Sequence, residues 1–281
     1  MRQAREGSAN GCEGPKREYI RVLPEVNFRG RSRIKSFPAG LGDPGKYNRR
    51  MRPSRTSANA VNRRLLSAYG HAVWRNPLPP VDELVSTILS QNTNDTNRDR
   101  AFEALRQQFP TWEKVRDAGE VDVIEAIRSA GLANQKGPRI QAVLRQITAE
   151  RGAIDLEFLR ELAPEDARKW LLQFKGVGPK TAAIVMLFSL GKPAFPVDTH
   201  VFRVTGRLGL RPENIGEAAA HILLQGLFPP ETFVDVHLNL IRHGRQVCLA
   251  RRPRCDECIL RDLCNYRRER AGRQPIRRSR K

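Results

Sequence analysis

The sequence predicts an all-α protein. Between residues 61 and 242, apolar side chains recur at intervals of three and four residues, which is the period of an amphipathic helix. Glycine and proline mark short connections between these runs. No segment shows the sustained alternation of apolar and polar residues that a half-buried strand needs. The chain has 281 residues, of which 40% are hydrophobic, so it can bury one large core or two smaller ones.

The expected helices follow one another in order. The first is a short amphipathic run at residues 61–69, and the next run spans residues 81–109. Pro79 and Pro80 precede this second run, and Asp82 is its expected cap. The later helices are predicted at residues 121–129, 136–150, 164–174, 179–190, 199–208, 217–227 and 233–242.

The two ends of the chain differ from its middle in composition. Residues 1–60 contain 14 Lys+Arg and 5 Asp+Glu, and residues 265–281 contain 8 and 1, so most of the net charge of +20 lies at the ends. Residues 1–60 are rich in Gly, Arg, Pro and Ser, which predicts a largely disordered basic extension, although Met51 is an alternative start. Residues 265–281 are interpreted as a basic C-terminal tail. Such charge favours nucleic acid as a partner without identifying a function.

Two classes of protein are not expected. No stretch approaches about 18 uninterrupted apolar residues, so we predict no membrane span. The N-terminal segment lacks an apolar signal region, which predicts a cytoplasmic, nucleoid-associated bacterial protein.

A candidate anion site lies where residues 172–183 join two helical runs through Gly176, Val177 and Gly178. The glycines permit a tight turn and close approach of another backbone, and Pro179 suits the first position of the second helix. Exposed amides at such a helix–hairpin–helix turn suit a DNA phosphate. The same residues also fit a plain packing corner between two helices, so the motif alone leaves both interpretations open.

Lys180 and Asp198 are the candidate catalytic residues. Lys180 falls in the first turn of the second helix, where the helix dipole favours the free amine, and a free amine can attack an electrophilic carbon. Asp198 is a carboxylate that can activate such an amine and stabilise positive charge building on a sugar. The alternative for Lys180 is a simple contact with a phosphate, and the alternative for Asp198 is a simple N-cap. We predict structural roles for His200, His237 and His243.

Four cysteines predict a metal centre. Cys248, Cys255, Cys258 and Cys264 have the spacing C-x6-C-x2-C-x5-C, and a chain without a secretion signal uses such a group for metal binding rather than for disulfides. Only Cys255 and Cys258 form the close pair that zinc sites usually repeat, so a [4Fe–4S] cluster is favoured over zinc. Nearby arginines at positions 251, 252, 254 and 261 are available to face DNA, and Cys12 is interpreted as a bystander.

Taken together, three segments resemble endonuclease III of the helix–hairpin–helix glycosylase superfamily. They are residues 174–182 (FKGVGPKTA), residues 197–204 (VDTHVFRV), and residues 243–245 (HGR) followed by the four cysteines. The resemblance implies a two-lobed all-α fold that binds DNA in the cleft between the lobes. The implied units are a helical barrel lobe at 83–194 with the hairpin at about 164–190, and a lobe with the [4Fe–4S] loop at 61–82 and 195–264.

The same resemblance assigns roles to single residues. Lys180 is the implied nucleophile and Asp198 its acidic partner. Residues 131–136 resemble the segment whose leucine, here Leu132, wedges into the base stack, and Lys136 at its end is taken as a further DNA contact. Residues 90–95 resemble the segment whose side chain, usually Gln, fills the gap left by the extruded base. Asn92 stands at that position here, with Gln91 one place earlier.

The implied activity is that of a bifunctional DNA glycosylase and AP lyase in base-excision repair. Such an enzyme would act as a monomer on double-stranded DNA, remove oxidised pyrimidines and cut on the 3′ side by β-elimination. One rival is a monofunctional mismatch glycosylase, which Lys180 disfavours because the adenine-mismatch branch usually lacks this lysine. The others are a non-catalytic DNA-binding module, disfavoured because Lys180 and Asp198 are both present, and a zinc protein.

Overall fold

The computed structural model describes residues 53–72 and 77–272. Every regular element within these two ranges is a helix, which confirms the all-α prediction. None of these helices is both long enough and apolar enough to cross a membrane. Most of the predicted disordered extension, residues 1–52, lies outside the described residues.

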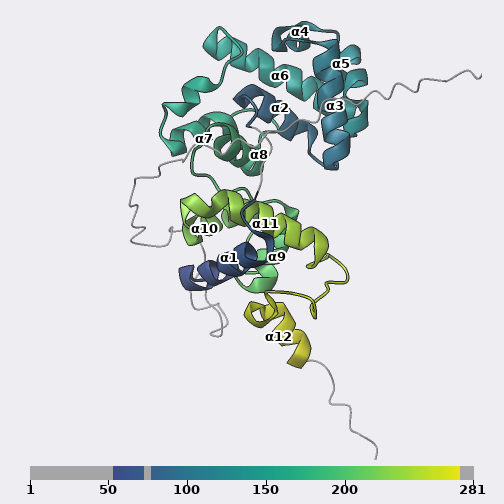
Figure 1. Cartoon of the computed structure of the whole chain (residues 1–281). Coiled ribbons are helices and arrows are strands. Elements are labelled where there is room, and N and C mark those ends of the chain that lie inside the picture. Colours follow the sequence, from purple (N-terminus) through teal and green to yellow (C-terminus); the bar gives the residue numbers. More distant parts are fainter. Residues whose placement is uncertain (1–52, 73–76, 273–281) are drawn as a thin grey trace, which may run out of the picture.

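The helices form two lobes that lie one above the other in Figure 1. The upper lobe contains α2 to α8, and its apolar core is built from side chains between Val81 and Ala194. Its elements are α2 (Pro80–Leu89), α3 (Asp95–Gln108), α4 (Trp112–Asp117), α5 (Glu120–Ala126), η2 (Arg128–Ala130), α6 (Ala133–Arg151), η3 (Glu157–Arg160), α7 (Pro164–Leu172) and α8 (Pro179–Ile184).

The lower lobe joins the first described helix to the last ones. Its core contains Ala58, Val61 and Leu65 of the first helix together with side chains from Phe195 to Cys264. Its elements are α1 (Arg55–Tyr69), α9 (Thr199–Leu208), α10 (Glu217–Leu227), η5 (Pro230–Thr232), α11 (Phe233–Gln246), η6 (Arg261–Leu263) and α12 (Asn265–Gly272).

The segment that follows the hairpin serves both cores. α8 continues directly into η4 (Val185–Ser189), a single π-helical stretch. The side chains of this continuous α8–η4 segment divide between the two lobes. The upper core receives Ala182, Ala183, Val185 and Met186, and the lower core receives Ile184, Leu187 and Phe188. A π-helical turn places side chains around the axis differently from an α-helix and often occurs at functional sites. The hairpin is therefore anchored at the junction of the two lobes.

Several helix boundaries differ from the predictions. α1 begins at Arg55, inside the segment predicted to be disordered, because the Ser54 side chain accepts a hydrogen bond from the Ser57 amide at 3.1 Å and caps the helix. The run predicted at 81–109 is two helices, interrupted at residues 90–94. Asp82 is not a cap, because its carboxylate accepts a hydrogen bond from the Trp112 indole at 3.0 Å. Residues 265–272 of the expected tail form α12.

Candidate DNA-binding and catalytic site

The hairpin between α7 and α8 has the geometry of an anion-binding turn. Gly176 has a φ of +89°, a conformation that L side chains rarely adopt. Gly178 is the N-cap of α8 and Pro179 is its first residue. Within the described residues, the amides of Gly176 and Gly178 have no backbone acceptor. Both amides therefore remain available to an anion.

Val177 contributes to this turn differently from the prediction. Its amide donates to the Phe174 carbonyl at 3.0 Å, and its side chain is buried in the upper core. Neither its amide nor its side chain is free for a phosphate. The assignment of Val177 as a DNA contact is therefore corrected: this residue shapes the turn from inside.

Two non-glycine residues in the described part of the chain have a positive φ, and they are Asn92 at 54° and Leu132 at 51°. A left-handed conformation is uncommon for any side chain and costs more for leucine than for asparagine. Asn92 is exposed in the loop between α2 and α3, and Leu132 keeps 47% of its surface exposed at the N-cap of α6. Both predicted insertion residues thus lie on sharply turned, solvent-facing loops of the same lobe. Backbone strain of this kind is concentrated at functional sites.

Lys136 does not lie at the surface. Its side chain is 1% exposed, and its ammonium donates to the carbonyls of Leu89 at 2.7 Å and Ala130 at 2.9 Å. Burial, and then the charge of Arg139, lower the pKa of Lys136 to about 8. The prediction of Lys136 as a DNA contact is wrong, because the loop before α6 folds back over the side chain. Lys136 instead joins the ends of α2 and η2, directly before the two insertion loops.

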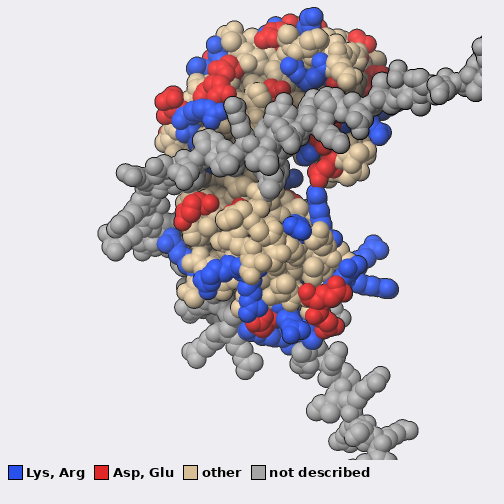
Figure 2. Space-filling model, viewed as in Figure 1, with Lys and Arg blue, Asp and Glu red and all other residues tan. Residues whose placement is uncertain are grey.

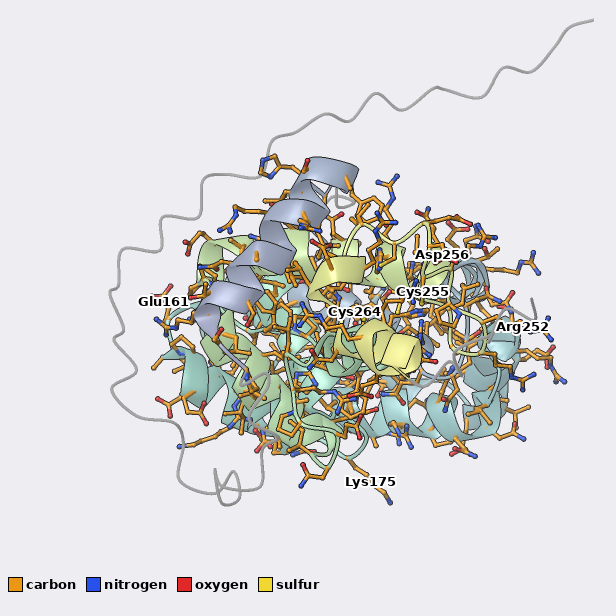
Figure 3. All side chains as sticks on the ribbon, turned by 90° about the horizontal axis from the view of Figure 1, so that it is seen from below. Glu161, Lys175, Arg252, Cys255, Asp256 and Cys264 are labelled. Atoms are coloured by element: carbon orange, nitrogen blue, oxygen red, sulfur yellow. The ribbon has the colours of Figure 1, made fainter. Side chains whose placement is uncertain are left out.

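Replacement of Lys136 by methionine is expected to lower the free energy of unfolding by about 1–3 kcal/mol. The variant leaves two buried carbonyls without a donor, and an unsatisfied buried group carries a penalty of this size. Urea denaturation measures the change. Lys175→Met is the matched control, because Lys175 is exposed beside the hairpin and projects outward at the edge of the molecule in Figure 3. An equal loss of stability in both variants would contradict this structural role for Lys136.

Asp198 begins α9 and lies beside buried histidines. Its Oδ1 accepts a hydrogen bond from the Val201 amide at 2.7 Å, so the N-cap role is present. The negative charge of Asp198 and the positive charge of Lys180 act in opposite directions on the pKa of His237. Lys180 is half-buried in the first turn of α8. The charges of the two candidate catalytic residues thus both act on one buried imidazole.

His221 and His237 hold the segment that carries Asp198. The Nδ1–H of His237 donates to the Pro196 carbonyl at 3.0 Å, and that of His221 donates to the Phe195 carbonyl at 3.0 Å. Burial lowers the pKa of each of these histidines to about 4, so both are neutral near pH 7. His237 has the structural role expected of it. His221 was missed, because nothing in its local sequence shows which carbonyl it reaches.

An ion pair across the two lobes was also missed. The Arg245 guanidinium on α11 lies 2.8 Å from the carboxylate of Asp95 at the start of α3. Burial opposes ionisation of Asp95, but the Arg245 hydrogen bond and the charges of Arg245, Arg98 and Lys180 outweigh it and lower the pKa. Asp95 and Arg245 belong to two of the motif segments, residues 90–95 and residues 243–245. Only the folded chain brings them together, 150 residues apart.

The four cysteines surround one cavity at the end of the lower lobe. Cys248, Cys255, Cys258 and Cys264 line it together, and all four are free thiols. Two of them, Cys255 and Cys264, are labelled beside α12 in Figure 3. The Arg207 guanidinium, from α9, donates to the carbonyls of Leu249 and Ala250 at 2.7 Å each and so fixes the loop onto the lobe.

The donor set of this centre suits an iron–sulfur cluster. All four candidate ligands are cysteine sulfurs that line one cavity, and cysteine thiolates are the usual ligands of such clusters. Burial raises the pKa of Cys258 to about 11, against the hydrogen bond from the Leu260 amide and with the charges of the other three cysteines. A bound cation is therefore needed to hold this sulfur as a thiolate. His243 lies behind Cys258, with its Nε2 at 3.4 Å from the sulfur and its Nδ1 at 2.9 Å from the Tyr69 hydroxyl. His243 therefore has the structural role expected of it, because it supports one of the four candidate cysteine ligands.

Replacement of Cys258 by alanine is expected to remove both iron and acid-labile sulfide from the purified protein. The remaining three thiols leave one iron without its ligand. Metal and sulfide analysis of the brown wild type and of the variant measures this loss. Cys12→Ala is the control, because Cys12 lies far from the four ligands in sequence and is expected to leave the cluster intact. Zinc without sulfide in the wild type would contradict the assignment.

Basic side chains surround the cysteine loop. Figure 2 shows lysines and arginines, interspersed with acidic residues, on the end of the lower lobe that carries α12. The four arginines singled out in the sequence are all exposed, namely Arg251, Arg252, Arg254 and Arg261. Arg252 lies at the periphery of the molecule in Figure 3.

Comparison with known proteins identifies the family. Residues 85–230 match the model of the HhH-GPD superfamily of base excision DNA repair proteins, and residues 248–264 match the iron–sulfur binding domain of endonuclease III. A protein of Arabidopsis thaliana named as a DNA glycosylase is 40% identical over 165 residues, which are 59% of this chain and 56% of that protein. The chain thus spans little more than half of that relative.

Two further proteins match over most of their length. Endonuclease III of Sulfolobus acidocaldarius is 35% identical over 185 residues, which cover 65% of this chain and 80% of that enzyme. A solved structure of a non-covalent endonuclease III–DNA complex has a TM-score of 0.65 and 26% identity, over 78% of this chain and 99% of that one. These similarities confirm the predicted fold and the iron–sulfur site. The chain belongs to the HhH-GPD superfamily of base excision DNA repair proteins and is similar to endonuclease III.

Proposed function

We propose that this protein is a bifunctional DNA glycosylase and AP lyase that removes oxidised pyrimidines from double-stranded DNA and cuts the strand 3′ to the resulting abasic site. The observation that carries the proposal is the position of Lys180 in the first turn of α8, directly after a hairpin whose Gly176 and Gly178 amides have no backbone acceptor among the described residues. The charges of Lys180 and Asp198 both act on the pKa of His237, which supports a shared role for the two side chains. Relatives named endonuclease III, and the similar solved structure of an endonuclease III–DNA complex, support the choice of DNA as substrate.

In this mechanism the upper lobe opens the duplex. Asn92 and Leu132, on their strained loops, enter the base stack once the damaged nucleotide is extruded. The amides of Gly176 and Gly178 bind a phosphate of the same strand. The chain then acts as a monomer, with both lobes contacting one duplex.

The chemistry belongs to Lys180 and Asp198. The Lys180 amine attacks C1′ of the sugar, the bond between C1′ and the base breaks, and the base leaves with the bonding electrons and a proton. Asp198 helps to deprotonate Lys180 and stabilises positive charge on the sugar. The C1′–O4′ bond then breaks as the nitrogen lone pair forms a C1′=N bond, and O4′ takes up a proton. The resulting ring-opened iminium makes the C2′ proton acidic. Its removal breaks the C3′–O bond, and hydrolysis then frees the lysine.

The iron–sulfur cluster has a supporting role in this proposal. Bound to the four cysteines, it would hold residues 248–264 and their exposed arginines in position. No step of the reaction depends on a change in its oxidation state.

A panel of duplexes that differ at one position tests this function. One carries an oxidised pyrimidine, one a G·T mismatch, one a G·A mismatch and one an abasic site. We expect release of the oxidised base coupled to strand cleavage, and cleavage of the abasic duplex. Release of thymine or adenine without cleavage would instead assign a monofunctional mismatch glycosylase.

A further inference from the structure

The side chain of Arg139 connects the loop that carries Asn92 to the hairpin. The Nη1 of Arg139, on α6, donates to Gln91 Oε1 at 3.0 Å. The Gln91 amide Nε2 in turn donates to the Gly176 carbonyl at 3.1 Å. These two hydrogen bonds join three segments that are 48 and 85 residues apart in sequence.

The chemistry of these partners fixes the orientation of the Gln91 amide. A guanidinium only donates and a backbone carbonyl only accepts, so Gln91 must present its oxygen to Arg139 and its nitrogen to Gly176. Both ends of this half-buried side chain are then occupied. Gln91 is not free to enter a base stack, whereas its neighbour Asn92 is exposed on a strained backbone.

Gly176 also accommodates the Arg139 side chain. A Cβ atom added at Gly176 would lie 2.3 Å from Arg139 Cδ and 2.4 Å from its Nε. The guanidinium stem therefore passes directly over the hairpin backbone. Gly176 meets two demands at once, the positive φ of the turn and the close approach of Arg139.

We propose that Gln91 and Arg139, the Gln91–Arg139 clasp, are positioning residues that couple phosphate capture at the hairpin to insertion of Asn92 into the duplex. The inference rests on the proposed function, because it assigns a part of the same reaction. Without the clasp, the Asn92 loop loses its side-chain link to the hairpin, and the hydrogen bond from Lys136 to the end of α2 remains to tie it to α6, which also presents Leu132. The insertion geometry must be held by supporting contacts, and removing such a contact loosens it.

The clasp is needed most where a base pair must be opened. A hydrogen bond to a charged group shifts an equilibrium by about 10-fold to 100-fold, and we expect the same factor in the rate of a step that needs this bond. Gln91→Ala and Arg139→Ala are therefore expected to reduce release of a paired damaged base by about this factor. Cleavage at an abasic site, which has no base to extrude, is expected to change much less. A merely structural loss would lower both rates together.

The conservative variant separates positioning from simple charge. Arg139→Lys keeps the positive charge, but its side chain ends one atom short of the Nη1 that donates to Gln91, so it is expected to behave like Arg139→Ala. The double variant is expected to be no worse than either single variant, since both remove the same link. Arg145→Ala is the control on the same helix, because Arg145 bonds the Arg116 carbonyl instead and is expected to leave both rates unchanged.

The deciding experiment follows insertion without catalysis. The full-length cluster-loaded protein binds a duplex with a tetrahydrofuran abasic analogue and 2-aminopurine in the opposite strand, next to the gap. Wild type and Arg145→Ala are expected to raise the fluorescence, whereas Gln91→Ala and Arg139→Ala bind with little change in Kd and lose most of the rise. A full rise in both clasp variants, or rescue by Arg139→Lys, overturns the proposal. This assay measures insertion and breaks no bond. A wild type without glycosylase or lyase activity would therefore refute the proposed function but would not decide the result for Gln91 and Arg139.

Discussion

Lys180→Gln is expected to abolish strand cleavage at an abasic site, with a fall in rate of about 10³-fold or more. The variant removes the amine that forms the covalent intermediate, and loss of a nucleophile is among the most severe single changes in an enzyme. Lys180 is half-buried in the first turn of α8, and glutamine retains most of its length there. Gel analysis of a single-site abasic duplex, under single-turnover conditions, measures the rate.

Lys169→Gln is the matched control for this variant. The Lys169→Gln substitution makes the same change of charge on the neighbouring helix, α7. There the Lys169 ammonium lies 3.9 Å from the Asp166 carboxylate in an exposed pair. We expect Lys169→Gln to cleave like the wild type. Binding of both variants to an uncleavable analogue duplex should stay close to that of the wild type. Cleavage by Lys180→Gln at the wild-type rate would remove Lys180 from the mechanism.

Asp198→Asn is expected to slow base release by about 10²-fold to 10⁴-fold, because it removes the negative charge that activates the amine and stabilises the sugar cation. The structure makes this substitution informative. Asp198 Oδ1 caps α9 through the Val201 amide at 2.7 Å, and asparagine caps a helix about as well as aspartate. The helix and the two histidine contacts before it should therefore persist. Single-turnover release of the damaged base is the measurement.

Asp155→Asn provides the comparison for this second change. Exposed Asp155 accepts a hydrogen bond from the Glu157 amide at 3.0 Å, so like Asp198 it bonds a nearby backbone amide, but it has no part in the site. Unchanged turnover in Asp198→Asn would reduce Asp198 to a cap alone. An unaltered melting temperature in both variants shows that the effect on rate is chemical.

The features that a sequence predicts well here are local. The helices α9 and α10 coincide with the predicted residues 199–208 and 217–227, because their apolar periodicity is uninterrupted. The four cysteines and the Gly-Val-Gly turn could also be identified from the sequence, because each motif lies within one short segment. The N-cap at Ser54 was also a local signal, but the polar composition around it hid the first turn of α1.

The features that the sequence could not reveal depend on burial or on distant partners. Lys136 follows an exposed loop in sequence, and only the fold shows that Leu89 and Ala130 enclose its ammonium. The pairing of Asp95 with Arg245 and the contact of Arg139 with Gln91 join segments that are far apart in the sequence. No periodicity encodes which side chain meets which carbonyl. Site motifs were therefore identifiable, whereas the contacts that support them were not.

Borohydride trapping on a duplex with one abasic site tests the central claim most directly. Reduction captures a Schiff base between a protein amine and the sugar, and digestion with mass spectrometry identifies the amine. We predict one covalent adduct, at Lys180, that is absent from Lys180→Gln and present in Lys169→Gln. An adduct at another lysine or at the N-terminal amine, or none from cluster-loaded wild type, would contradict the assignment of Lys180 as the nucleophile.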